Sequence, residues 1–195
     1  YDSFSDALPG PTGRSRDPIE ETALRRRPGA GPASGWTDAL HSYFTRSSAF
    51  ALRAQRVYVP TELAQYGTNG RFVDVDMAID PHEDWHPDHT FDRRQDIDYR
   101  RQTFRWLDLH GLVLGTEHGN DWGVEYVEYT EGSLGGPFWW LHHTPGGWST
   151  NPIRNAARPD EYRPEYLAYG HGYDTRIPLW QLVYHDCAVS TWYWG

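Results

Sequence analysis

Lysine is absent from the 195 residues, and cysteine and methionine occur once each. The single cysteine, Cys187, excludes an intrachain disulfide and a cysteine-rich zinc site. No run of about 18 apolar residues is present, so the sequence predicts no transmembrane helix.

Basic residues are also fewer than acidic ones: the chain has 18 arginines and 27 acidic residues, and its net charge is −9. A nucleic-acid-binding domain needs a basic face to neutralise phosphates, and anionic membrane surfaces attract basic segments. The composition therefore argues against nucleic acid and membrane as partners. It leaves a neutral or a cationic ligand open.

Aromatic residues are plentiful, with ten Trp and thirteen Tyr, although the mean hydropathy is only −0.77. This composition is too aromatic for a disordered chain, so rings must supply much of the buried surface. The sequence starts at Tyr1 and ends in an aromatic run, and we expect an internal fragment of a longer protein. Localisation stays open, and a secreted or periplasmic enzyme is compatible with it.

Local sequence patterns divide the chain into two regions. Residues 1–35, rich in Gly, Pro, Ser and Arg, predict a loop or extended arm in which Arg25 to Arg27 form a solvated patch. In residues 36–195, apolar spacing predicts a helix over 36–66 that Pro60 interrupts, and a second helix over 92–110. Strands are predicted over 71–77, 112–117 and 177–184.

A strand, a helix of about 20 residues and a second strand form a βαβ unit with parallel strands. Ionisable groups stand at the ends of the predicted strands: Asp74 and Asp76, then Glu117, then His185 with Asp186. A (β/α)8 barrel builds its active site from such strand ends, and a whole barrel takes about 250 residues. We therefore expect an α/β fold, a partial (β/α)8 TIM-type barrel over residues 36–195 that is a fragment of a larger catalytic domain.

Asp74 and Glu117 form the candidate catalytic pair. In a glycosidase, one ionised carboxylate attacks the sugar carbon while a carboxylic acid with a raised pKa protonates the leaving oxygen. Asp76 remains a second candidate nucleophile, because the sequence does not define the register of the strand end. The structural alternative is that these acids cap helices or pair with arginines.

Carbohydrate binding is indicated by rings and polar groups near this pair. Aromatic rings stack on the apolar faces of sugars, although for a single Trp packing in the core is the more common role. The residues expected to contact a carbohydrate substrate are Asp76, His118, Trp122, Trp139, Trp140, His185 and Asp186.

A competing motif spans His82 to His86 and matches H-E-x-x-H of zinc proteases. That chemistry needs both histidines on one helix face, whereas Pro81 and Pro87 flank the motif and disfavour a helix. A metal-dependent hydrolase using His82, Glu83 and His86 is thus one alternative. A non-catalytic carbohydrate-binding barrel is the other.

Three segments, 70–75, 115–119 and 176–186, resemble the catalytic barrel of glycoside hydrolase families 101 and 129. The resemblance extends over about residues 45–195. It implies retaining hydrolysis of α-linked N-acetylgalactosamine, with Asp74 as nucleophile and Glu117 as acid/base. No cofactor is required, although family 129 implies a bound calcium ion whose ligands have no counterpart assigned here. The segment 80–91 lengthens the interval between the two acids and predicts a loop over the cleft.

Overall fold

The computed structural model describes residues 2–3, 6–7, 23–29, 31–37, 42–117, 119–131, 154–155, 158–162, 183–184 and 186–191. Its centre is a five-stranded sheet of order β1-β5-β6-β7-β10, in which every neighbouring pair is parallel. The strands are β1 (Asp2–Ser3), β5 (Gly70–Asp74), β6 (Val113–Thr116), β7 (Tyr129–Glu131) and β10 (Val189–Thr191). This confirms the predicted parallel α/β class. Across these described ranges the sheet is open, with β1 and β10 at its edges.

Helix α3 (Arg93–Asp108) connects β5 to β6 and confirms the predicted βαβ unit. Its first turn is closed by a capping box, in which Gln95 N donates to Asp92 Oδ1 (2.9 Å) and Asp92 N donates to Gln95 Oε1 (3.0 Å). The buried residues of α3 recur every three or four positions on one face: Asp96, Arg100, Thr103, Phe104 and Leu107.

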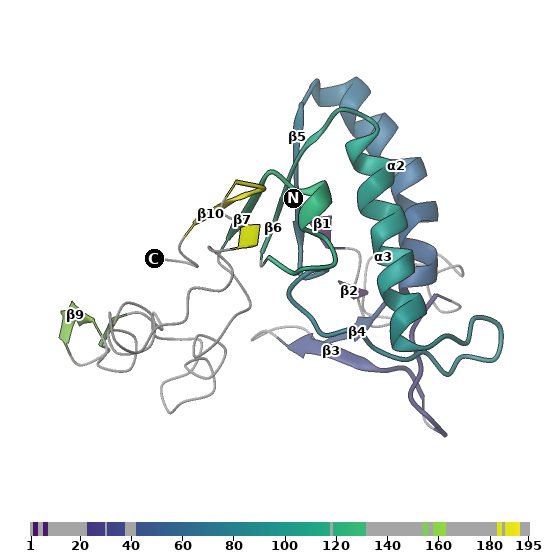
Figure 1. Cartoon of the computed structure of the whole chain (residues 1–195). Helices are drawn as coiled ribbons and strands as arrows, with labels where there is room; N and C mark the ends of the chain where they lie inside the picture. Colours follow the sequence, from purple (N-terminus) through teal and green to yellow (C-terminus); the bar gives the residue numbers. More distant parts are fainter. Residues whose placement is uncertain are drawn as a thin grey trace.

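Helix α2 (Ala51–Tyr66) lies beside α3, and both contribute to one hydrophobic core with β5 and β6 (Figure 1). Val59, Val73, Phe104, Leu107 and Leu114 are fully buried there. The helices therefore cover one face of this part of the sheet.

The predicted helix over 36–66 is wrong in its first half, because the α-helix begins only at Ala51. Strands β3 (Ser34–Thr37) and β4 (Ser42–Thr45) pair antiparallel there, and the 3-10 turn η1 (Ser48–Phe50) leads into α2. Backbone pairing with distant segments replaces the local helical bonds that apolar spacing favours. Pro60 lies inside α2 rather than ending it, and Thr61 Oγ1 donates to the carbonyl of Val57 (3.2 Å).

Residues 1–35, predicted as a loop or arm, contribute to two of the three described sheets. β1 pairs with β5, and β2 (Asp6–Ala7) joins β4 and β3 in a second, antiparallel sheet of order β2-β4-β3. Leu24 forms an isolated bridge with Arg46. The domain boundary after residue 35 stays a prediction.

The strand predicted over 177–184 is not observed at residues 183–184, which are helical, and residues 177–182 lie outside the described residues. The strand of this region is β10, which begins at Val189. Two further strands, β8 (Arg154–Asn155) and β9 (Arg158–Tyr162), pair antiparallel, and the 3-10 turn η2 (Val124–Tyr126) precedes β7. Among the described helices, none is long and apolar enough to cross a bilayer.

Candidate active site

Asp74 is the last residue of β5, and Glu117 directly follows β6. The two strands are neighbours and run parallel, with Val73 opposite Thr116. Continuing this register by one residue brings Asp74 next to Glu117. Both residues are partly exposed. The prediction that these acids stand at the carboxyl ends of consecutive strands is confirmed.

The face of β5 that carries Asp74 is opposite the helical layer. Val73 is fully buried in the core with residues of α2 and α3, and side chains alternate along a strand. Phe72, two residues before Asp74, is opposite Gly115 on β6, which is opposite Tyr129 on β7. The rings of Phe72 and Tyr129 are 6.1 Å apart, and a β-carbon at Gly115 would overlap the Tyr129 ring. The rings of Phe72 and Tyr129 therefore form an aromatic row, which precedes the acidic strand ends on the same face of the sheet.

Val75 has a positive φ of 67°, which a β-branched residue rarely adopts. The chain reverses at this residue, because Asp76 N donates to the carbonyl of Asp74 (2.7 Å). Asp76 is buried, with 3% of its surface exposed, whereas Asp74 remains partly exposed. Strained residues of this kind concentrate at functional sites.

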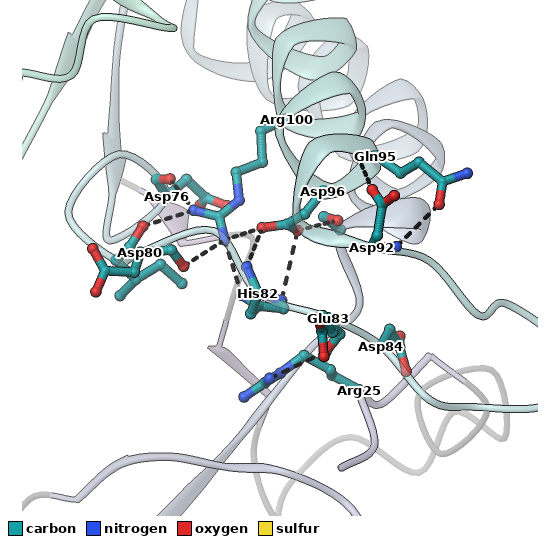
Figure 2. Close-up of polar contacts among 12 residues, drawn as sticks. Arg25, Asp76, Asp80, His82, Glu83, Asp84, Asp92, Gln95, Asp96 and Arg100 are labelled. Atoms are coloured by element: carbon teal, nitrogen blue, oxygen red, sulfur yellow. Dashed lines mark hydrogen bonds and ion pairs between the residues drawn. The ribbon is translucent and has the colours of Figure 1, made fainter. Parts of the chain in front are cut away.

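Arg100 of α3 holds the chain that follows this turn (Figure 2). Its guanidinium donates to the carbonyls of Asp76 (2.7 Å), Ile79 (3.0 Å) and Asp80 (3.4 Å). The same guanidinium is paired with Asp96 at 2.5 Å, and both side chains are buried. One buried cation thus binds three backbone carbonyls of the loop.

Asp96 binds the same loop from the other side. Its carboxylate accepts from the Ser48 hydroxyl (2.6 Å) and from the backbone N–H of His82 (3.1 Å). Sequence reasoning did not assign a role to Asp96 or Arg100. The signal for them is an acid and a base four residues apart on the buried face of a helix.

His82 lies between these two charges. Its Nδ1 lies 3.0 Å from a guanidinium nitrogen of Arg100, and its Nε2 lies 3.6 Å from Asp96 Oδ1. Burial of the ring lowers the pKa of His82 to about 4, with Arg100 acting in the same direction and Asp96 against it. The imidazole is therefore neutral at pH 7.

The H-E-x-x-H segment is not helical, as its flanking prolines indicate. His86 stacks on His89, with ring centroids 4.0 Å apart, while His82 is held by Arg100. Buried Asp84 accepts from His86 N (2.9 Å) and lies 2.8 Å from His89 Nδ1. The two histidines of the motif thus have separate surroundings, which do not fit a zinc-protease site.

In the part of the chain that the structure describes, no three His, Cys, Asp or Glu side chains are grouped so that they could hold a metal ion. The described residues therefore do not fit the calcium ion that the family resemblance implies.

Two of the predicted substrate contacts are placed differently from expectation. Trp122 is 5% exposed and packs edge-on against Phe104, so its ring belongs to the core instead of presenting a stacking face. Asp186 is exposed in a turn before β10, so it precedes a strand instead of ending one. Neighbouring Cys187 is exposed. His118, Trp139, Trp140 and His185 lie outside the described residues.

A parallel sheet covered by helices, with carboxylates at the ends of neighbouring strands, is the arrangement from which barrel glycosidases are built. The profile of the family described as glycosyl hydrolases related to GH101 family, GH129, matches residues 16–195. The chain belongs to this family, which confirms the resemblance seen in the sequence. A search of curated proteins gave no match.

Solved structures with the same fold include the α-N-acetylgalactosaminidase NagBb from Bifidobacterium bifidum. Its complex with GalNAc is 24% identical, with a TM-score of 0.65, and its ligand-free form is 25% identical, with a TM-score of 0.64. The complex with Gal-NHAc-DNJ is 24% identical, with a TM-score of 0.66. Each match covers 96% of this chain but only 25%, 26% and 25% of the three solved chains, respectively. The chain thus spans about a quarter of their length.

Proposed function

We propose that this chain forms part of the catalytic barrel of a retaining glycoside hydrolase acting on α-linked N-acetylgalactosamine. The observation that carries the proposal is the position of Asp74 and Glu117 at the ends of adjacent parallel strands in register. The proposed substrate is inferred from the solved relative NagBb, which is named as an α-N-acetylgalactosaminidase. The remainder of the barrel would complete the cleft.

The strand spacing supports a retaining mechanism. Neighbouring strands lie about 4.7–4.9 Å apart. Retaining glycosidases hold their two carboxyl groups about 5–5.5 Å apart, whereas inverting enzymes leave roughly 6.5–9.5 Å for a water molecule. Carboxylates on adjacent strands in register match the shorter separation.

In the proposed reaction, an Asp74 carboxylate oxygen attacks the anomeric carbon as the bond from this carbon to the leaving oxygen breaks. Glu117 donates a proton to the leaving oxygen, and a covalent glycosyl–Asp74 ester forms. In the second step Glu117 takes a proton from water, whose oxygen attacks the anomeric carbon and releases Asp74. The aromatic row of Phe72 and Tyr129 lies on the face of the sheet that carries Asp74.

Asp74→Asn in the full-length protein tests the nucleophile, with Asp76→Asn as the matched variant. Turnover of an aryl α-N-acetylgalactosaminide should fall by several orders of magnitude in Asp74→Asn only, because an amide cannot form the ester. Loss in Asp76→Asn with normal turnover in Asp74→Asn would move the nucleophile to Asp76. Normal turnover in both variants would end the assignment.

Glu117→Gln tests the acid/base by leaving-group dependence. A substrate with a poor leaving group needs the proton, so it should lose far more turnover than an aryl glycoside with a good leaving group. Proton NMR of the first product should show the α-anomer. A first product of β configuration would exclude retention, and binding of the sugar without hydrolysis would favour the non-catalytic alternative.

A further inference from the structure

A pocket of about 170 Å³ opens where the N-terminal segment meets the connection from β5 to α3. Three stretches of chain line it: residues 25–28, residues 81–85 and Arg93, the first residue of α3. Its polar and aromatic lining consists of Arg25, Arg27, His82, Glu83, Trp85 and Arg93. The sequence predicted that Arg25 and Arg27 belong to a solvated patch. In the structure they line one pocket together with Arg93.

The three guanidinium groups have few partners. In the described part of the chain none of them forms an ion pair; Arg25 donates to the carbonyl of Glu83 (3.3 Å), and Arg27 donates to the hydroxyl of Ser34 (3.5 Å). Glu83 brings the one carboxylate of the lining, and that carboxylate accepts from the indole N–H of Trp85 (3.3 Å). Positive charge therefore exceeds negative charge in the pocket.

This local charge contrasts with the net charge of −9 for the whole chain. Burial lowers the pKa of the Arg25 guanidinium, repulsion from Arg27 acts in the same direction, and attraction to Asp84 and Asp96 acts against it. An anion in the pocket would offset the repulsion between the guanidinium groups. Guanidinium groups bind carboxylates and sulfate-like oxyanions through paired hydrogen bonds, which gives the pocket a chemical preference.

Trp85 adds an apolar surface at the same place. Trp85 lies in the loop between β5 and α3, and 50% of its surface is exposed. An accessible indole beside guanidinium groups suits a ligand that has both a sugar ring and a negative charge.

The position of the pocket connects it to the proposed catalytic acids. The connection that supplies residues 81–85 begins immediately after Asp74 and the Val75 turn. In a (β/α) barrel, such connections at the carboxyl ends of the strands form the substrate cleft. Arg100 and Asp96 hold the intervening residues rigidly, including His82 of the pocket wall (Figure 2).

We propose that this arginine pocket, defined by Arg25, Arg27, Arg93 and Trp85, binds the carboxylate or sulfate ester of an acidic glycan. It lies on the connection that follows β5, and it acts as a subsite of the cleft that such connections form. The identification of the ligand as a glycan rests on the proposed function, whereas binding of an anion does not.

Two exposed arginines of the pocket provide the test, because Arg27 and Arg93 can be changed without opening the core. The probes are N-acetylneuraminic acid, N-acetylgalactosamine 6-sulfate and neutral N-acetylgalactosamine, titrated into the full-length protein by calorimetry. The matched control is Arg94→Gln, which removes an exposed charge one residue further along α3 and outside the pocket.

Arg27→Gln with Arg93→Gln should weaken binding of the acidic probe by about tenfold or more, because hydrogen bonds to charged groups contribute more to binding than those between neutral groups. Binding of the neutral sugar should stay within about twofold, and Arg94→Gln should match the unmodified protein. The acidic probe that shows the loss identifies the group as a carboxylate or as a sulfate ester.

Equal binding of the acidic probes to the double variant and the unmodified protein would overturn the proposal. So would an equal loss in Arg94→Gln, because it would indicate a diffuse charge effect. Turnover of the neutral aryl glycoside is measured on the same samples. Absent turnover with arginine-dependent anion binding would reject the glycosidase function and retain the anion site.

Discussion

Val75 combines a β-branched side chain with a left-handed backbone, directly after the proposed nucleophile. A side chain at this φ costs about 1–2 kcal/mol relative to glycine. The turn nevertheless directs the chain from the strand end into the loop that Arg100 anchors. The strain is therefore retained where the backbone must leave the sheet abruptly.

We expect Val75→Gly to be more stable than Val75→Ala by about 1 kcal/mol, because only glycine adopts this φ without steric cost. Both variants lose the valine methyl groups, so the comparison isolates the backbone term. Urea denaturation of the two proteins measures it. An alanine variant as stable as the glycine variant would show that the backbone at this position is not strained in solution.

His82 links stability to pH. Its pKa is lowered to about 4 in the folded protein from an ordinary value of 6.5. Between these pH values the unfolded chain binds a proton that the folded protein does not bind. The free energy of unfolding should therefore fall as pH drops from 6.5 to 4, by at most about 3 kcal/mol from this residue. Above pH 6.5 both states are neutral and the effect vanishes.

His82→Asn provides the comparison, because an amide oxygen can accept from Arg100 as Nδ1 does but does not titrate. Denaturation midpoints at pH 7, 6, 5 and 4 should fall less steeply in this variant. Burial lowers the pKa of His86 as well, so part of the slope remains. Identical slopes in both proteins would contradict a depressed pKa at His82.

At the scale of the element, α3 combines two tasks on one face. Phe104 and Leu107 pack in the core, while Arg100 and Asp96, one and two turns before Phe104, hold the loop between β5 and α3. Apolar periodicity predicted the helix, and local signals mark its two ends: the Asp92–Gln95 capping box at the start and Gly111, with its positive φ, just after the last turn. Apolar periodicity could not predict that these two charged residues would be buried, since the backbone atoms they bind lie 14 to 24 residues away and Asp96 also binds the distant Ser48 hydroxyl.

Arg100→Met should destabilise the protein by roughly 3–5 kcal/mol, because it leaves Asp96 charged and buried and removes the donors to three carbonyls. Arg94→Met, at an exposed position of the same helix, should change stability by less than about 0.5 kcal/mol. Thermal and urea denaturation measure both. Equal costs for the two variants would mean that the buried network contributes no net stability.

Across the whole molecule, the N-terminal segment and the β5–α3 loop are joined by backbone contacts. Asp84 accepts from Arg26 N (3.0 Å), and Trp85 N donates to the carbonyl of Arg26 (3.1 Å). This junction forms the arginine pocket and connects a segment near the start of the chain to the loop that follows β5. Composition alone suggested a solvated arm, because residues so far apart in sequence give no local sign of their pairing.

Asp84→Ala should open this junction, because the buried carboxylate is the acceptor for the Arg26 N–H and a partner of His89. Limited digestion with trypsin should then cleave faster after Arg25 and Arg26, whereas the bond after Arg27 precedes Pro28 and resists trypsin. Asp88→Ala is the control, since the Asp88 side chain is 84% exposed. Unchanged cleavage in Asp84→Ala would show that the N-terminal segment is held by other contacts.

The sequence by itself determined the parallel βαβ unit, the cap and end of α3, the acids at the ends of β5 and β6, and the family. These features depend on residues close together in the chain, where propensity, capping and alternation act directly. Tertiary structure alone decided that residues 34–37 and 42–45 form strands, that Trp122 packs in the core, and that Arg25, Arg27 and Arg93 share a pocket. Those outcomes depend on backbone pairing and burial between distant segments, whose free energy has no counterpart in local sequence.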